Sequence, residues 1–310
     1  MIPAKDQDQS ATACRPRPGT ARDLLLIAEG LHVLNPSVYE AIDSRDQDRL
    51  MDLVRKQVSA GAQALDVNLG PGKAMGSLTP WVLSAIRQVT DVPLFLSAQV
   101  LSLPQILEGY RGELTINAVT ADPEFLPQAM KTARQYGAGL VVLLVRPGLV
   151  PSGIDGRDQL AMEVLDQAVK NDLPLEQLYL DPVIGCRPDP AAWEVSHGLP
   201  EIGPVLEAIT LIKELGNDLV RTIVGLGSCS QGLARGSRSA LHCRLLPLLA
   251  EAGLDAVIMN CLDGELMAAA RAIKDGTCPA LPSARPVNRH RGQGGAWSQS
   301  RYLNFSICRR

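Results

Sequence analysis

The sequence predicts a (β/α)8 barrel, a closed ring of eight parallel strands in which a helix follows each strand. Eight short apolar runs alternate with eight stretches of helical periodicity over roughly 255 residues. Hydrophobic residues make up 46% of the 310-residue chain and aromatic residues only 4%. The core must therefore be mainly aliphatic, as in parallel sheets buried beneath helices.

The first four strand–helix units follow from short apolar runs, each succeeded by apolar residues at helical spacing. The expected strands are 24–28, 64–67, 93–96 and 114–116, and the expected helices are 46–57, 80–88, 104–108 and 123–136. Two of these helices are followed by Gly61 and Gly137 just before the next strand, the usual signal for a helix end.

The last four units follow the same pattern. Their expected strands are 140–145, 178–180, 222–225 and 256–259, and their expected helices are 159–169, 204–214, 239–252 and 264–274. A doubly wound open sheet is the alternative. It would have about five to seven strands and usually a glycine-rich first turn, which Glu29-Gly30-Leu31-His32 does not supply.

The two ends of the chain differ from this barrel region, which we place at residues 23–276. We expect residues 1–22 to be a flexible leader, because they contain no apolar segment of the secretory kind. Residues 277–310 contain six Arg and no Lys, Asp or Glu, so we expect a basic, disordered tail. Such a tail either contacts acidic partners or RNA, or has no selected role.

Charge, hydropathy and cysteine usage restrict the class of protein. The net charge of −3 argues against broad nucleic-acid binding. The sequence contains no run of about 18 apolar residues, so no membrane-spanning helix is expected. The seven cysteines contain no CxxC pair, which suits the reducing cytoplasm. His242 beside Cys243 lacks a second pair at zinc-like spacing, so no metal site is expected.

Polar residues stand at or just after the end of nearly every expected strand. They are Glu29, Asp66 with Asn68, Ser97 with Gln99, Asn117, Arg146, Asp181, Ser228 with Ser230 and Gln231, and Asn260 with Asp263. In a closed parallel barrel these ends converge on one rim. With no paired His and no three-carboxylate cluster, the rim suits a polar heterocycle better than a metal. An Asp can accept two parallel hydrogen bonds from an amino-pyrimidinone edge, and Asn can donate and accept together.

Each such residue alone could instead cap the following helix. Asp66 and Asn68 form stronger evidence as a pair, because residues two apart leave the same face of a strand. Residues 223–232 resemble a phosphate-binding loop but match neither the Walker pattern nor GxGxxG. We expect Gly225 and Gly227 to allow the backbone close to a bound ring. Cys229 is not expected to be a nucleophile, since no His lies nearby in sequence.

Five segments in order make residues 24–276 similar to a known family. They are Ile27-Ala28-Glu29-Gly30, the run GAQALDVNLGP at 61–71, Thr115-Ile116-Asn117-Ala118, Leu178-Tyr179-Leu180-Asp181-Pro182, and Val224-Gly225-Leu226-Gly227-Ser228-Cys229-Ser230-Gln231. The chain resembles the pterin-binding TIM barrel of methyltetrahydrofolate:corrinoid/iron–sulfur protein methyltransferases. Relatives of that family are the folate domain of cobalamin-dependent methionine synthase and, more distantly, dihydropteroate synthase.

The resemblance implies a role for each residue at the rim. Asp181 and Asn117 would hold the amino-pyrimidinone edge of the folate, supported by Asp66, Asn68 and Glu29, with Gly225, Gly227 and Gln231 lining the pterin. The N5-methyl group of methyltetrahydrofolate would pass to cob(I)alamin on a separate corrinoid protein. Ser228 stands where the family has the Asn that contacts N5, and Ser97 stands where it has an Asp.

The resemblance therefore implies a cytoplasmic, homodimeric methyltransferase. Two other functions stay open. One is a non-catalytic or weakly active pterin-binding barrel that scaffolds a corrinoid complex, suggested by Ser97 and Ser228. The other is an enzyme of the dihydropteroate synthase type, which would need a basic anion site. The residues after expected strands seven and eight include no Lys for such an anion site, which disfavours an enzyme of the synthase type.

Overall fold

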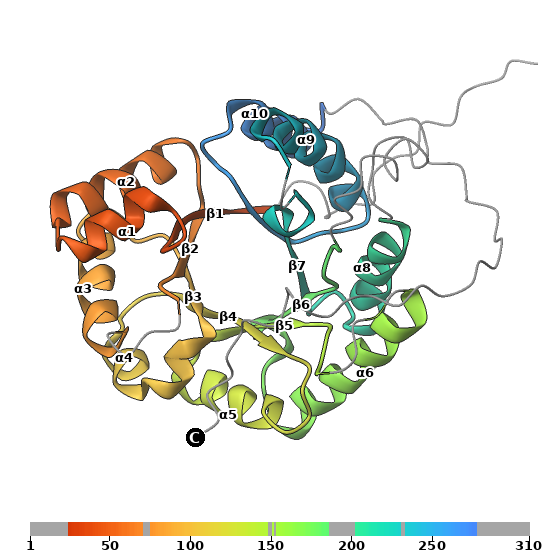
Figure 1. The fold of residues 1–310 in the computed structure, drawn as a ribbon. Helices are drawn as coiled ribbons and strands as arrows, with labels where there is room; N and C mark the ends of the chain where they lie inside the picture. The colour runs from red at the N-terminus through yellow and green to blue at the C-terminus, as the bar shows by residue number, and fades with distance from the viewer. Residues whose placement is uncertain are drawn as a thin grey trace, which may run out of the picture.

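Eight parallel strands close into a barrel in sequence order, with β8 pairing back to β1 (Figure 1). The computed structural model describes residues 24–70, 75–147, 151, 153–185, 202–230 and 233–277. The strands are β1 Leu25–His32, β2 Ala64–Asn68, β3 Leu94–Ser97, β4 Leu114–Thr120, β5 Gly139–Leu143, β6 Leu178–Asp181, β7 Arg221–Gly225 and β8 Ala256–Met259. The expected (β/α)8 barrel is confirmed, and the open doubly wound sheet is wrong.

Helices surround the outside of the barrel (Figure 1). They are α1 Pro36–Asp43, α2 Gln47–Ser59, α3 Met75–Arg87, α4 Pro104–Gly109, α5 Leu126–Tyr136, α6 Ile154–Lys170, α8 Gly203–Leu215, α9 Arg235–Glu251 and α10 Gly264–Lys274. Three short 3-10 turns complete the described elements: η1 Ala98–Ser102, η2 Leu175–Gln177 and η3 Leu226–Ser230. None of the helices in the described part of the chain is long and apolar enough to cross a membrane.

Several helices differ from the sequence prediction, among them α6, which begins at Ile154 rather than at residue 159, and α9, which begins at Arg235 rather than at residue 239. The structure also contains α1, where the sequence analysis expects no helix. The Asn35 side chain caps this helix by accepting a hydrogen bond from the Ser37 N–H at 3.2 Å. Helix α3 begins at Met75 rather than at residue 80, with Pro80 inside it. A proline inside a helix removes one backbone hydrogen bond, so the pattern alone favours a start at that residue.

Alternation along the strands divides the core into two parts. Residues facing the helices form the larger cluster, which includes Leu65, Leu96, Leu140 and Leu180. Residues facing the barrel axis form a second, separate cluster, here called the floor: Ile27, Ala64, Phe95, Val141, Tyr179, Ile223 and Ala256. Phe95 and Tyr179 pack edge to face, with ring centroids 5.5 Å apart. The apolar floor fills the barrel interior beneath the carboxyl ends of the strands.

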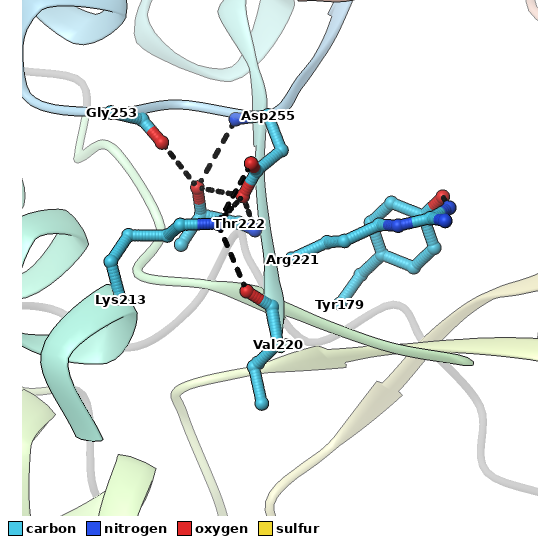
Figure 2. A network of polar contacts seen from close by, with 7 residues as sticks. All are labelled: Tyr179, Lys213, Val220, Arg221, Thr222, Gly253 and Asp255. Atoms are coloured by element: carbon cyan, nitrogen blue, oxygen red, sulfur yellow. Dashed lines mark hydrogen bonds and ion pairs between the residues drawn. The ribbon is translucent and has the colours of Figure 1, made fainter. Parts of the chain in front are cut away.

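A polar network holds the opposite end of the barrel, where β7 and β8 begin (Figure 2). Asp255 accepts hydrogen bonds from Lys213 Nζ at 2.9 Å and 3.0 Å, and from the Thr222 N–H at 2.6 Å. Lys213 Nζ also donates to the Val220 carbonyl at 3.3 Å. Because the Lys213 side chain is only 13% exposed, this ion pair is largely shielded from water. The network joins α8 to the first residues of two strands.

The proposed boundaries of the chain's ends stay predictions. The leader at residues 1–22 and the tail from residue 278 onward lie outside the described residues. The described barrel runs from Leu24 to Thr277, with the gaps given above.

Candidate functional site at the carboxyl ends of the strands

A ring of mostly polar residues lies directly above the apolar floor. Side chains two positions apart on a strand share a face, so the residues two beyond each floor position also face the barrel axis. They are Glu29, Asp66, Ser97, Leu143, Asp181, Gly225 and Ile258, to which β4 adds Asn117. We call these eight residues the upper layer. The barrel therefore changes from apolar to acidic within one layer.

An irregularity in β1 lies at Glu29. The pairing of β1 with β2 shifts register between Ala28 and Leu31. Such bulges redirect side chains next to binding sites. Gly30 lies inside the shift, where a Cβ atom would collide with the amide of Gln57 from α2. Glycine at position 30 thus lets α2 pack close to the strand that carries Glu29.

Asp66 and Asn117 are joined by a hydrogen bond across the layer. Asn117 Nδ2 donates to Asp66 Oδ1 at 2.9 Å, linking β2 to β4 past β3. β4 also shifts register beside Asn117, between Ile116 and Val119. The bond fixes which way the Asn117 amide points, so its carbonyl oxygen stays available as an acceptor.

Asp181 ends β6, and its carboxylate turns back onto the chain that follows. Asp181 Oδ1 accepts a hydrogen bond from the Val183 N–H at 2.7 Å. Val183 has a φ of 57°, in the left-handed region that β-branched residues rarely adopt. The guanidinium of Arg157 donates to the carbonyls of Pro182 at 2.8 Å and Val183 at 3.3 Å. This turn leaves the other carboxylate oxygen of Asp181 as a free acceptor among the described contacts.

The three carboxyl groups of the upper layer hold protons more strongly than usual. Burial and, to a smaller extent, the nearby Asp66 raise the pKa of Glu29 to about 7, against the opposing effect of Arg238. Burial raises the pKa of Asp181 to about 7 against the opposing Val183 N–H and Arg157. Burial raises the pKa of Asp66 to about 6 against the Asn117 hydrogen bond. All three residues stay partly accessible to solvent, as side chains beneath an open rim would be.

The turn after β7 brings backbone close to Glu29. A Cβ atom at Gly227 would lie 2.7 Å from Glu29 Oε2, so only glycine lets this carboxyl group rest against the turn. A Cβ atom at Gly225 would meet Ser228 Oγ at 3.6 Å, an ordinary contact. Gly225 is therefore not required by packing. Gln231 lies outside the described residues.

The other rim residues serve mainly local structure. Ser97 Oγ donates to Gln99 Oε1 at 2.9 Å. Asn68 Oδ1 accepts from the Gly70 N–H at 3.0 Å, so it closes a turn and is not bonded to Asp66. Asp263 caps α10 through the N–H groups of Glu265 and Leu266, and Arg146 pairs with Glu163 at 2.8 Å.

Two residues near the layer were missed by sequence reasoning. Arg157 belongs to α6, and nothing in its local sequence marks it as a neighbour of Asp181. Cys261 directly follows the polar residue after β8, which could have indicated it. Burial and the neighbouring Glu29 raise the pKa of its thiol to about 12. Within the described ranges, no three His, Cys, Asp or Glu side chains come together as a metal site.

Glu29→Gln is expected to remove a pH-dependent destabilisation. The usual Glu pKa is 4.5 and the folded value is about 7, so between these values the folded state binds more protons than the unfolded state. The free energy of unfolding of the native protein should therefore fall as pH rises from about 4.5 to 7. At pH 8 the variant should avoid a cost on the order of 3 kcal/mol. Urea unfolding at pH 5 and pH 8 measures this difference. The exposed Glu251→Gln serves as control, and an unchanged pH dependence in Glu29→Gln would contradict the assignment.

Comparison with known proteins supports the resemblance at two levels. No family model matches the sequence. The chain is 22% identical over 254 residues to a methylcorrinoid:tetrahydrofolate methyltransferase of Eubacterium limosum, covering 79% of this chain and 88% of that protein. The resemblance inferred from the five segments is thus confirmed in sequence.

Solved structures agree on the fold. A dihydropteroate synthase of Xanthomonas albilineans with 4-aminobenzoic acid superposes with a TM-score of 0.60 at 16% identity, over 84% of this chain and 95% of that one. A dihydropteroate synthase of Yersinia pestis gives 0.57 at 14% identity, over 82% and 93%. At these identities the structures establish a shared barrel architecture.

Proposed function

We propose that this protein transfers a methyl group between methyltetrahydrofolate and the cobalt of a corrinoid carried by a partner protein. The observation that carries the proposal is the upper layer itself, which combines an acceptor for a pterin edge at Asp181 with a proton-holding pair at Glu29 and Asp66. The sequence similarity to a methylcorrinoid:tetrahydrofolate methyltransferase supports it.

Binding of the pterin edge would use Asp181 and Asn117, the two upper-layer side chains whose orientation is already fixed by hydrogen bonds. Asp181, once ionised, accepts hydrogen bonds from the ring N–H and amino groups, with Val183 fixing the carboxylate. Asn117 accepts a further N–H through its carbonyl oxygen, because its amino group is bonded to Asp66. Gly225, which has no side chain in the upper layer, leaves room for the flat ring, and Asn68 and Ser97 complete the rim.

Methyl transfer needs a proton at N5 of the folate. When the bond between N5 and the methyl carbon breaks, its electron pair stays on the nitrogen and the methyl group goes to the nucleophilic cobalt. A hydrogen bond or proton at N5 stabilises this departing nitrogen. Asp66 is close enough to Glu29 to raise the Glu29 pKa. The Glu29 carboxyl group also lies against Gly227, in the turn that bears Ser228. Glu29 would supply the proton, and Ser228 would contact N5 directly or through water.

Gly225→Val tests whether the ring occupies the upper layer. The added Cβ makes only ordinary contact and valine favours strands, so the free energy of unfolding should change by less than about 1 kcal/mol. Because the side chain would fill the layer, we expect the affinity for methyltetrahydrofolate to fall about 100-fold. Calorimetric titration measures the affinity and urea unfolding the stability. Unchanged affinity in a folded variant would place the ring elsewhere.

Binding and activity measurements together separate the proposal from its alternatives. We expect the protein to bind methyltetrahydrofolate and not to condense a dihydropterin pyrophosphate with 4-aminobenzoate. Condensation of those two compounds would favour the synthase type. Folate binding without any methyl transfer to cob(I)alamin would favour the scaffold. A protein that binds no methyltetrahydrofolate would contradict both the methyltransferase and the scaffold.

A further inference from the structure

At its carboxyl end, β6 pairs with only one of its two neighbouring strands. The ladder between β6 and β7 stops at Leu180, paired with Thr222. On the other side, β5 still pairs with Asp181 through Leu143, and the Leu144 N–H donates to the Asp181 carbonyl at 2.8 Å. Asp181 is therefore held by the sheet on one side alone. Pro182, which follows it, has no N–H with which to continue a ladder.

Arg157 supplies the missing support from outside the sheet. This arginine of α6 is 7% exposed, which is rare for a charged residue. Its Nε donates to the Pro182 carbonyl at 2.8 Å and its Nη2 to the Val183 carbonyl at 3.3 Å. Its Nη1 donates to the Gly153 carbonyl at 2.8 Å, just before α6. One guanidinium thus ties two consecutive carbonyls after β6 to the start of α6.

The same turn sets the direction of the Asp181 carboxylate. The Val183 N–H that reaches Asp181 Oδ1 belongs to the same planar peptide as the Pro182 carbonyl, so the Arg157 contact to that carbonyl also holds this N–H. Val183 itself lies in the left-handed region, with φ of 57°. Isolated valine avoids that region, so neighbouring contacts must hold it there. The Arg157 contacts to Pro182 and Val183 are suited to this, since they fix the carbonyls on both sides of the Val183 N–H.

We propose that Arg157 is a positioning residue, which holds the Pro182–Val183 turn so that the Val183 N–H orients the Asp181 carboxylate toward the upper layer. This inference rests on the proposed function for its consequence in pterin binding, although the orientation itself involves no ligand. The planar fork is essential, because a lysine ammonium is a single point charge that cannot reach three carbonyls in fixed directions.

Two variants separate the fork from the charge. Arg157→Lys keeps a positive charge near Asp181, and Arg157→Met keeps most of the stem. NMR hydrogen exchange of the Val183 amide and the 13C titration of the Asp181 carboxyl, assigned with Asp181→Asn, need no ligand. We expect Val183 exchange to accelerate at least tenfold in both variants. The Asp181 titration should move to higher pH in Arg157→Met and less in Arg157→Lys. Methyltetrahydrofolate affinity should fall about tenfold in both.

The control is Arg134→Met, which removes an arginine that is 55% exposed and paired with Asp172 on the surface. It should leave Val183 exchange unchanged. If Arg157→Met does not fold, Arg157→Lys gives the decisive exchange rate. Native-like Val183 exchange in a folded Arg157 variant would overturn the inference. If the native protein binds no methyltetrahydrofolate but the Val183 amide exchanges faster in both Arg157 variants, the proposed function fails and the positioning of Asp181 by Arg157 stands.

Discussion

Asp181→Asn is expected to weaken methyltetrahydrofolate binding about 100-fold. The native carboxylate can accept two hydrogen bonds from the amino-pyrimidinone edge, whereas the Asn amide would present an amino group to one of these donors. Losing one charge-assisted hydrogen bond and leaving a buried donor unpaired costs about 3 kcal/mol. Calorimetric titration at pH 8 measures the change, because burial raises the Asp181 pKa to about 7 and the carboxylate must be ionised.

The pH dependence of binding provides a second readout of the same residue. Since the donors of the ring require an ionised acceptor, the affinity of the native protein should rise between pH 6 and pH 8, and that of Asp181→Asn should rise less. Asp52→Asn, on the exposed face of α2, is the matched control and should bind as the native protein does. Equal affinity in Asp181→Asn and the native protein would remove Asp181 from the binding site.

Asp255→Ala should destabilise the barrel by about 3 kcal/mol, because it leaves Lys213 largely buried without its carboxylate. The Thr222 N–H, which donates to Asp255 at 2.6 Å, would lose its partner as well (Figure 2). For a domain of this size the midpoint of thermal unfolding should fall by roughly 6–12 °C. Calorimetry and urea unfolding measure the two quantities. Folate binding should be unaffected at temperatures where the variant is folded, because the network lies at the opposite end of the strands.

The exposed pair of Arg55 and Asp52 provides the comparison for this effect. Its side chains are 53% and 62% exposed, so Asp52→Ala should change the free energy of unfolding by less than about 0.5 kcal/mol. A loss below about 1 kcal/mol in Asp255→Ala would show that the network contributes no more than a surface pair.

The sequence was sufficient to predict the barrel because its signal is local. Each strand is a short apolar run, and all eight observed strands overlap the expected ones. The convergence of Asp66, Asn117 and Asp181 was also predictable, since parallel strands present their carboxyl ends on one side. Helix starts were harder to predict: α1 is absent from the expected elements, and α3 and α6 begin at Met75 and Ile154 rather than at residues 80 and 159. In α3 the internal Pro80 favours the later start.

Contacts between distant segments could not be predicted in the same way. Nothing in the residues around Arg157 indicates that it reaches the carbonyls after β6, which are 25 or 26 positions away. The approach of Glu29 to Gly227 joins β1 to the turn after β7, and the amino-acid pattern reveals neither this contact nor the register shift in β1. The alternation of a strand predicts that Asn68 acts together with Asp66, whereas the Asn68 side chain accepts a hydrogen bond from the Gly70 N–H.

The most direct test of the proposed function is a methyl-transfer measurement with cob(I)alamin. The native protein is mixed anaerobically with methyltetrahydrofolate and cob(I)alamin, and the absorption spectrum of the corrinoid is followed. We expect conversion to methylcob(III)alamin at a rate that depends on protein concentration and that falls at least tenfold in Glu29→Gln and Asp181→Asn, with Glu251→Gln as active control. Conversion no faster than without protein, while methyltetrahydrofolate binds, would contradict the proposed methyltransferase.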